Sequence, residues 1–371
     1  MLTSQLGIRL ILMMGQTVPL PAPREVLEAV TNVQVTNDEQ GGDGFSISFS
    51  LSKSQPVDYD LLQGGAVAQG TRVVIGVLLG AVPQVLIDGI ITHHQVVPSA
   101  DPGASTLTVM GKDVSVMMDL EEKNATYPNQ TDSVIVTQLI AAYLQYGLAP
   151  KVTTTTNVPL ETDHVPGQHE TDLQFIKSKA QSNGYVFYIE PVTVGVNTAY
   201  WGPVIRVGAM QPRLTMGMGA ASNLKSLSFS QDSLLPVKTE GGVIILFGQE
   251  IPIPPIPPLR VPPFVTTPTP ALRTVLMRTT ANQSAADATT AAFAAALKSP
   301  DSVTGNGEID TIRYGNILRA RKLVNVRGAG LSYDGTYYVK RVTHTITRTD
   351  YKQSFSISRE GTGALLPIVA P

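Results

Sequence analysis

The chain has 371 residues, enough for two or three domains that each bury a core. Only 15% of the residues are charged and 43% are hydrophobic, which indicates an ordered protein with a weakly charged surface, as in a subunit covered by neighbours. Because the chain contains no cysteine, disulfides, thiolate metal sites and cysteine nucleophiles are excluded.

The apolar run near the N-terminus does not have the features of a targeting or spanning segment. Residues 8–14 are too few to cross a bilayer, and Arg9 interrupts the run. Prolines follow soon after it, and no small-residue cleavage site is evident. We therefore expect no export signal and no stable membrane insertion.

Strands dominate the first third of the sequence. Residues 45–51 alternate strictly between apolar side chains and serine, the period-two pattern of a half-buried strand. Strand-like runs also cover residues 71–79, 85–92 and 106–110, with turn residues between them. Short strands at this spacing favour an antiparallel barrel or sandwich. Residues 1–125 are predicted to hold an N-terminal arm and a first β-barrel.

An inserted α+β region is predicted at residues 126–205. Asp132 is expected to cap its first helix. Its clearest unit is residues 171–190, in which Thr171 or Asp172 begins an amphipathic helix that stops before an aromatic strand. The strand does not alternate, which is typical of a strand covered on both faces.

A proline-rich arm interrupts the second β-rich region, which is predicted as a second β-barrel at residues 206–371. Nine of the twenty-one residues 250–270 are proline, so we expect a stiff extended segment without a strand ladder or a helix. The arm is predicted to reach an adjacent subunit. An alanine-rich helix is predicted at residues 284–298. The remaining predicted elements are strands, at residues 223–229, 243–247, 323–327, 336–344 and 353–358.

Charge is distributed unevenly along the chain. Residues 311–360 contain ten Lys or Arg and three Asp or Glu, so this segment carries +7 and the net charge of −2 leaves −9 elsewhere. The segment reads as plain strands and matches no recognised nucleic-acid-binding fold, so contact with another copy or a neighbouring subunit is favoured. The candidate interface residues come from the proline-rich arm and this basic segment: Pro254, Pro255, Pro257, Pro258, Arg260, Arg321, Lys322 and Arg327.

No catalytic, cofactor or metal site is predicted. His93 and His94 are adjacent, so on a strand they point to opposite faces, and we expect one to be buried and one exposed. Gly217 and Gly219 lack the third glycine and the βαβ context of a dinucleotide loop. The sequence has no nucleophile elbow or Walker loop, and we expect the protein not to be an enzyme.

Several segments resemble, in the same order, a family of known proteins. They are the alternating strand at residues 45–51, Gly-Thr-Arg-Val at 70–73, Asp-Gly-Ile-Ile at 88–91, Leu-Thr-Val at 107–109 with Gly111 and Asp113, the helix-to-strand unit at 172–188, Asp-Gly-Thr-Tyr-Tyr-Val at 334–339, His344, and Tyr351 through Phe355. Together they resemble the baseplate hub family of contractile tails. This family includes phage late control D proteins and the hub part of type VI secretion VgrG.

The resemblance implies a homotrimeric ring in which each chain contributes two similar β-barrels, so that three chains present a pseudo-sixfold surface. One face would contact the inner tube or a tube-initiator protein, and the other would hold a separate spike protein; baseplate wedge components would surround the ring. No specific nucleic-acid recognition is implied. Assembly would take place in the bacterial cytoplasm, as part of a tail or injection particle. The proline-rich arm departs from the family pattern.

Two other classes of function are left open. A β-rich carbohydrate-binding or adhesin-like tail protein would expose an aromatic platform, for which the sequence offers a single tryptophan, Trp201. A hydrolase would need a site assembled from distant residues. Within the hub class, a phage tail and an extracellular contractile injection system both need a trimer that joins a hexameric tube, so the sequence does not distinguish them.

Overall fold

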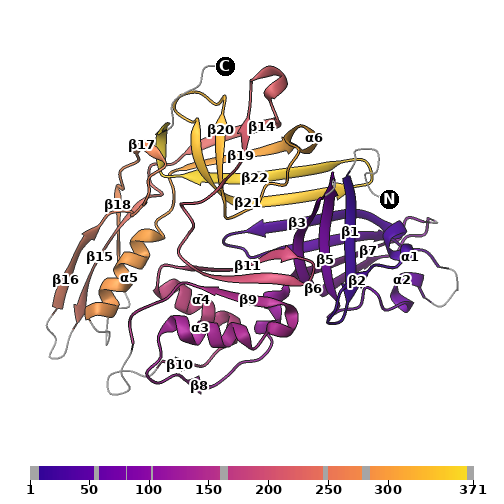
Figure 1. Ribbon diagram of the computed structural model, residues 1–371, viewed down its shortest axis with the longest axis horizontal. Coiled ribbons are helices and arrows are strands. Elements are labelled where there is room, and N and C mark those ends of the chain that lie inside the picture. The colour runs from indigo at the N-terminus through magenta and orange to yellow at the C-terminus, as the bar shows by residue number, and fades with distance from the viewer. Residues whose placement is uncertain are drawn as a thin grey trace.

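The computed structural model describes residues 8–53, 58–80, 82–101, 103–158, 166–244, 250–277 and 285–365 (Figure 1). The fold is mainly β, with a large antiparallel sheet at its centre and a mixed α+β region attached. Within these residues no helix has the length and hydropathy needed to cross a membrane.

The first β-rich half is an antiparallel sheet with its own core. Its elements are β1 (Ile8–Gly15), β2 (Leu20–Pro21), α1 (Arg24–Ala29), β3 (Val30–Asp38), β4 (Gly44–Ser50), α2 (Asp60–Gln63), β5 (Arg72–Leu79), β6 (Val82–Val97) and β7 (Thr106–Asp113). The alternation predicted for residues 45–51 is confirmed, since Phe45, Ile47 and Phe49 are buried while the serines between them are half-buried. Strands β5, β6 and β7 lie where the sequence predicts them.

The mixed region packs two helices against a small sheet. It contains β8 (Ala125–Thr126), α3 (Asp132–Ala141), β9 (Leu148–Val152), β10 (Gly167–Gln168), α4 (Asp172–Ser182), β11 (Val186–Thr193) and β12 (Val196–Gly202). Strand β12 pairs antiparallel with β11 and parallel with β9. Thr171 caps α4 as predicted, but the cap of α3 is Thr131, one residue before the predicted Asp132. Both threonines accept a hydrogen bond from an N–H in the first turn.

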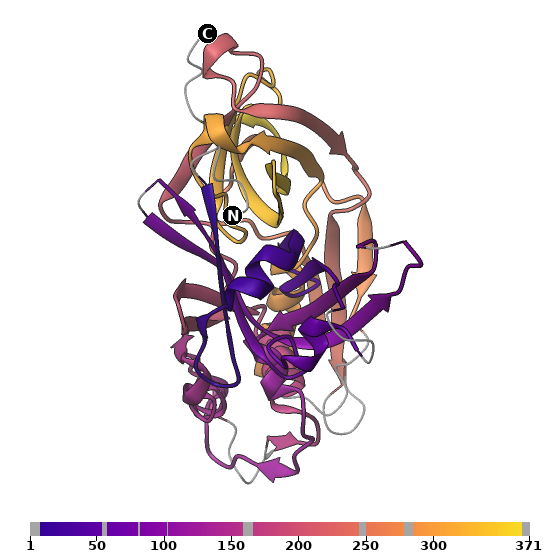
Figure 2. The ribbon, with the colours of Figure 1, turned by 90° about the vertical axis from the view of Figure 1, so that its right-hand side faces the viewer.

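The second β-rich half continues the sheet of the first. It contains β13 (Met210–Thr215), β14 (Leu224–Gln231), β17 (Val265–Pro268), β19 (Val303–Asp310), α6 (Thr311–Tyr314), β20 (Leu323–Arg327), β21 (Gly335–Thr347), β22 (Tyr351–Arg359) and β23 (Gly361–Ala364). Strand β21 pairs antiparallel with β3, which joins the halves into a 13-stranded sheet. Ile317, Ile346 and Tyr351 of the second half also complete the core of the first. Figure 2 shows the second half and the mixed region at opposite ends of the molecule.

The first part of the proline-rich segment and the alanine-rich helix form a projecting lobe. It consists of β15 (Val237–Ile244), β16 (Glu250–Ile256), β18 (Arg273–Leu276) and α5 (Ala285–Leu297). In Figure 1 this lobe lies on the side of the molecule away from the first β-rich half. The helix has nearly the predicted bounds. The predicted strand at residues 243–247 is described only to residue 244, within β15.

The prediction that the proline-rich segment forms no strand ladder is wrong at both ends of the segment, since β16 pairs with β15 and β17 pairs antiparallel with β23. Strand β16 pairs antiparallel with β15, in a register that places Pro252 opposite Gly242. Strand β16 is an edge strand, and alternate residues of an edge strand do not donate to the ladder. Pro252 and Pro254 alternate with Ile251 and Ile253, a pattern that an edge position tolerates.

Candidate interface

Arg321 joins the two β-rich halves and the mixed region. Its Nη1 donates to Asp43 Oδ2 at 3.0 Å, and its Nη2 donates to Asp43 Oδ1 at 2.5 Å and to the carbonyl oxygen of Asp38 at 2.6 Å. The guanidinium also lies 4.5 Å from the ring centroid of Tyr188. Asp43 in turn accepts from the side chain of Asn37. Arg321 is buried, so its charge holds this chain together and does not lie on an outer surface.

Two further basic residues of the second half also find partners within the chain. Lys322 pairs with Glu190 of the mixed region at 2.5 Å, and both side chains are partly exposed. Arg319 donates to Gln84 Oε1 in the first half at 2.9 Å. Arg327 lies half-buried at the end of β20. Much of the positive charge of this segment is therefore paired within the chain. A role of Lys322 and Arg327 between subunits stays a prediction.

Arg260 fastens the end of the proline-rich segment to its own chain. Its Nε donates to Asp301 Oδ1 at 2.9 Å, and its Nη1 donates to the carbonyl oxygen of Leu297, at the end of α5, at 2.7 Å. Asp301 also accepts from Ser358 Oγ at 2.6 Å. Burial raises the pKa of Asp301, but the charge of Arg260, the hydrogen bond from Ser358 and the charges of Lys340 and Arg206 together hold it below the usual value. The four prolines predicted at an interface precede Arg260 in the sequence. Pro254 lies in β16, Pro255 and Pro257 are exposed, and Pro258 is half-buried.

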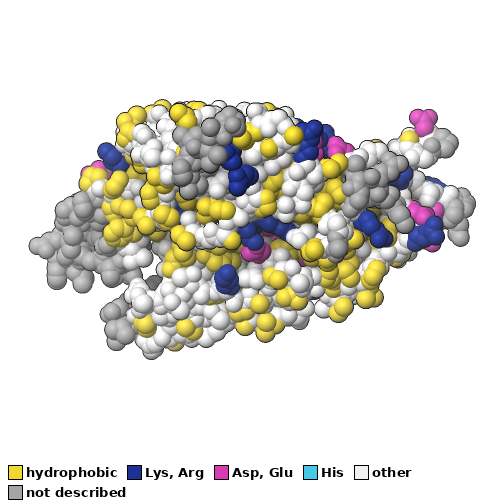
Figure 3. Space-filling view, turned by 45° about the horizontal axis from the view of Figure 1, so that its top comes forward, with side chains coloured by type: hydrophobic (Ala, Val, Ile, Leu, Met, Phe, Trp, Pro, Cys, Tyr) yellow, Lys and Arg dark blue, Asp and Glu magenta, His cyan; other side chains and the backbone are white. Residues whose placement is uncertain are grey.

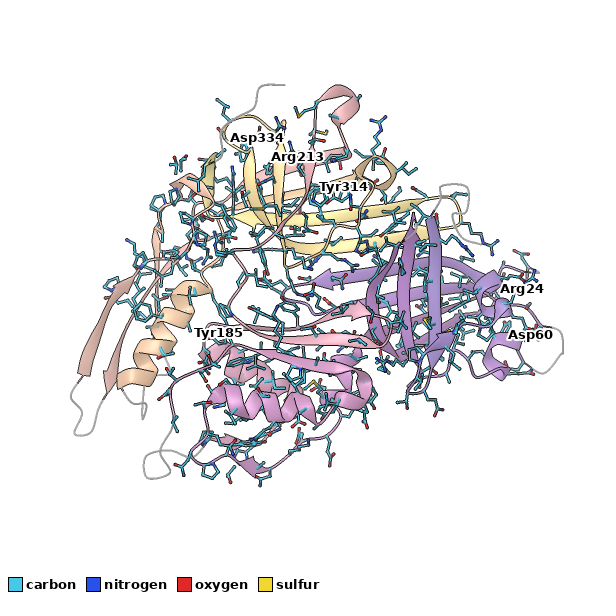
Figure 4. All side chains as sticks on the ribbon, in the orientation of Figure 1. Arg24, Asp60, Tyr185, Arg213, Tyr314 and Asp334 are labelled. Atoms are coloured by element: carbon cyan, nitrogen blue, oxygen red, sulfur yellow. The ribbon has the colours of Figure 1, made fainter. Side chains whose placement is uncertain are left out.

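A groove of about 540 Å³ opens between the mixed region, the proline-rich segment and β21. Tyr185, Val186 and Phe187 are half-buried and form part of its apolar lining. Tyr185 lies at the end of α4 near α5, and packs edge-on against Trp201 at a centroid distance of 4.8 Å (Figure 4). Val261 contributes a rim that is 79% exposed.

The groove carries more positive than negative charge. Its lining contains five basic and two acidic residues: Lys177, Arg206, Arg260, Lys298, Lys340, Glu39 and Asp301. Arg260 is paired within the groove, and Arg206 donates to Glu360 at 2.7 Å. Burial raises the pKa of Glu39, which favours its neutral form and weakens its negative contribution. Acidic side chains are also sparse on the face seen in Figure 3, where hydrophobic patches lie among basic groups.

Three of the histidines and the tryptophan lie within strands. His93 is exposed and His94 is half-buried, on either side of the β6 axis. His344 is buried, its Nδ1 lies 2.9 Å from Tyr351 Oη, and burial followed by the charge of Arg319 lowers its pKa to about 3. Trp201 is fully buried and offers no exposed aromatic platform. Within the described ranges no three His, Asp or Glu side chains are grouped as metal ligands.

Sequence reasoning missed the acidic partners and the groove. Asp43, Glu190 and Asp301 stand far from their basic partners in the sequence, and no local pattern marks them. The sequence offers one indication of these ion pairs, the excess of basic residues at 311–360. Most of these residues need acidic partners from other parts of the chain.

Comparisons with known proteins show which folds this chain resembles. A family model described as the Alg8 N-terminal domain matches residues 52–207, less than half of the chain. No curated protein matches the sequence significantly. Several solved structures match almost the entire chain, at identities that establish similarity of fold alone.

Three of these structures come from tails or a secretion system. A tail protein of Neisseria meningitidis is 14% identical, with a TM-score of 0.62 and coverage of 95% of this chain and 97% of that one. The 43 kDa tail protein of a Shewanella oneidensis prophage is 14% identical, with a TM-score of 0.61 and coverages of 95% and 98%. An E. coli type VI secretion component, described as similar to the T4 tail proteins gp27 and gp5, is 13% identical, with a TM-score of 0.57 and coverages of 91% and 77%.

Proposed function

We propose that this protein is a structural hub of a contractile-tail baseplate. In this role it forms a homotrimeric adaptor between a separate central spike and the hexameric inner tube or its initiator, with wedge components around it. The observation that carries the proposal is the fold shared with phage tail proteins and a type VI secretion component over nearly the full chain. The role requires no catalysis, and we propose that the protein is not an enzyme.

The joined sheet supports a structural role. Strand β21 pairs with β3 from Arg341 opposite Asp38 to Thr347 opposite Asn32, and the buried Arg321–Asp43 pair crosses the same junction. These contacts fix the two β-rich halves relative to each other. Three such chains would present six fixed β-rich units, which is the arrangement that a threefold-to-sixfold match requires. The same adaptor would serve a phage tail or an injection particle assembled in the bacterial cytoplasm.

The test is assembly of the purified protein with its neighbours. We expect light scattering after gel filtration to give three chains per particle and negative-stain microscopy to show rings with threefold symmetry and a sixfold outline. Separate binding experiments with the tube protein and the spike protein from the same locus should each give a stable complex. Stable monomers that bind neither protein would overturn the proposal.

A further inference from the structure

An exposed acidic segment lies at the N-terminal end of α4. Asp119 Oδ1 accepts from Thr171 Oγ1 at 2.6 Å, and Glu122 forms a β-bridge with Thr171, so the backbone of residues 119–122 is fixed there. Between these anchors Leu120 is 67% exposed. Within the described residues neither Glu121 nor Glu122 has an ion-pair partner.

The groove is complementary to this segment in charge and in polarity. Lys177, Lys298 and Lys340 line it, and none of them forms an ion pair within the part of the chain that the structure describes. Lys298 is exposed, and partial desolvation in the groove lowers its pKa, which a carboxylate partner would offset. The apolar lining includes Phe187, which a leucine side chain can contact, while the lysines can pair with two glutamates.

The two features lie at opposite ends of the same helix. The acidic segment contacts Thr171, the N-cap of α4, whereas the groove contacts Ala180, Gln181 and Gly184 at the other end. An 11-residue helix is about 16 Å long, and the segment is held at its own end, so it does not fold back into the groove of its own chain. A contact between unlike surfaces on different copies is head-to-tail, and such contacts form a ring where the rotation between copies closes and a filament where it does not.

We propose that the groove binds the acidic segment, residues 119–122, of a second copy of this chain. Leu120 enters beside the aromatic lining, and Glu121 and Glu122 pair with Lys298 and Lys340. The inference rests on the proposed multi-copy assembly and assigns the surfaces through which neighbouring copies meet.

Disulfide trapping tests the contact directly, because the natural chain has no cysteine. Leu120→Cys and Val261→Cys are placed on separately tagged chains, which are co-expressed and mildly oxidised. We expect a disulfide-linked species containing both tags on a non-reducing gel. The control pairs Leu120→Cys with Leu331→Cys, a site that is 64% exposed and outside the groove, and should give none. Equal trapping in both pairs, or none in either, would overturn the contact.

Charge exchange supplies a second readout. Reversing Glu121 and Glu122 to lysine, or Lys298 and Lys340 to glutamate, should each weaken self-association by about tenfold or more in analytical ultracentrifugation. Both reversals in one chain should restore association. Absence of rescue in chains with native Trp201 fluorescence contradicts the proposed pairing. Trimers that form without Leu120–Val261 trapping refute this contact and leave the hub proposal standing, whereas monomers that bind neither spike nor tube refute the hub proposal.

Discussion

Arg321 and Lys322 are neighbours in the chain, yet their charges lie in different environments. The side chains of the Arg321–Asp43 pair are 8% and 2% exposed, whereas those of the Lys322–Glu190 pair are 44% and 37% exposed. Water and salt screen the second pair and not the first. Adjacent residues of the same charge therefore contribute differently to stability.

Replacing Arg321 with methionine tests this difference. The change leaves Asp43 as a buried carboxylate without its counterion, and we expect the free energy of unfolding to fall by about 3–5 kcal/mol. Urea titration followed by circular dichroism measures the loss. The matched control is Lys322→Met, for which we expect a loss of about 0–1 kcal/mol because the pair is exposed. Equal losses in the two variants would contradict the claim that the buried pair stabilises the fold more than the exposed pair.

Asp113 makes stability depend on pH. Burial, and next the carboxylate of Asp43, raise the pKa of Asp113 to about 6, above the value of about 3.9 expected in the unfolded chain. Between these values the folded protein binds more protons, so this group lowers the free energy of unfolding as the pH rises, by about 1–3 kcal/mol in all.

Asp113→Asn isolates this contribution. The amide oxygen can still accept from the backbone N–H of Ser115, as Asp113 Oδ1 does at 2.8 Å, but the side chain no longer ionises. The stability of the variant relative to the natural protein should therefore increase from pH 4.5 to pH 7.5. Urea titrations across this range measure the difference, and a difference that is constant with pH would refute the linkage.

At the scale of elements, local patterns were sufficient where neighbouring residues decide the structure. The alternation at residues 45–51, the Thr171 cap and the alanine-rich helix were predicted because each depends on spacing within a few residues. Strand β16 could not be predicted, since proline disfavours strands and only its edge position beside β15 makes pairing possible. The groove likewise requires segments that are distant in sequence, and no local pattern indicates it.

The contact between α4 and α5 depends on a glycine. Gly184 has φ of +70°, and an added Cβ would lie 2.9 Å from Ala294 Cα in α5. Gly184→Ala should lower the free energy of unfolding by about 2–4 kcal/mol, combining the cost of the left-handed conformation with overpacking. The control is Gly195→Ala, where φ is +73° but nothing lies within 4 Å of the added Cβ, and about 1–2 kcal/mol is expected. Equal losses in urea titration would show that the packing contact contributes nothing.

At the scale of the whole molecule, the cores are not independent of one another. The first core includes Ile346 and Tyr351 of the second half, and Ile90 of β6 belongs to the core of the mixed region. Arg72 and Asp88 form a buried pair in the first half, and Arg72 also donates to the carbonyl oxygen of Tyr146 in the mixed region at 2.7 Å. Loss of one core therefore exposes side chains that complete another.

This coupling predicts that the mixed region and the large sheet unfold together. Trp201 is the single tryptophan, is buried in the mixed region and donates to the carbonyl oxygen of Ile176, so its fluorescence reports that region. Far-UV circular dichroism reports the secondary structure of the whole chain, most of which lies outside the mixed region. In urea the two signals should change with the same midpoint, since shared cores and buried pairs oppose separate unfolding. In Arg72→Met, which removes the ion pair between Arg72 and Asp88 and the contact with Tyr146, the Trp201 transition should move to lower urea. A Trp201 transition that already precedes the dichroism transition in the natural protein would show that the mixed region unfolds independently.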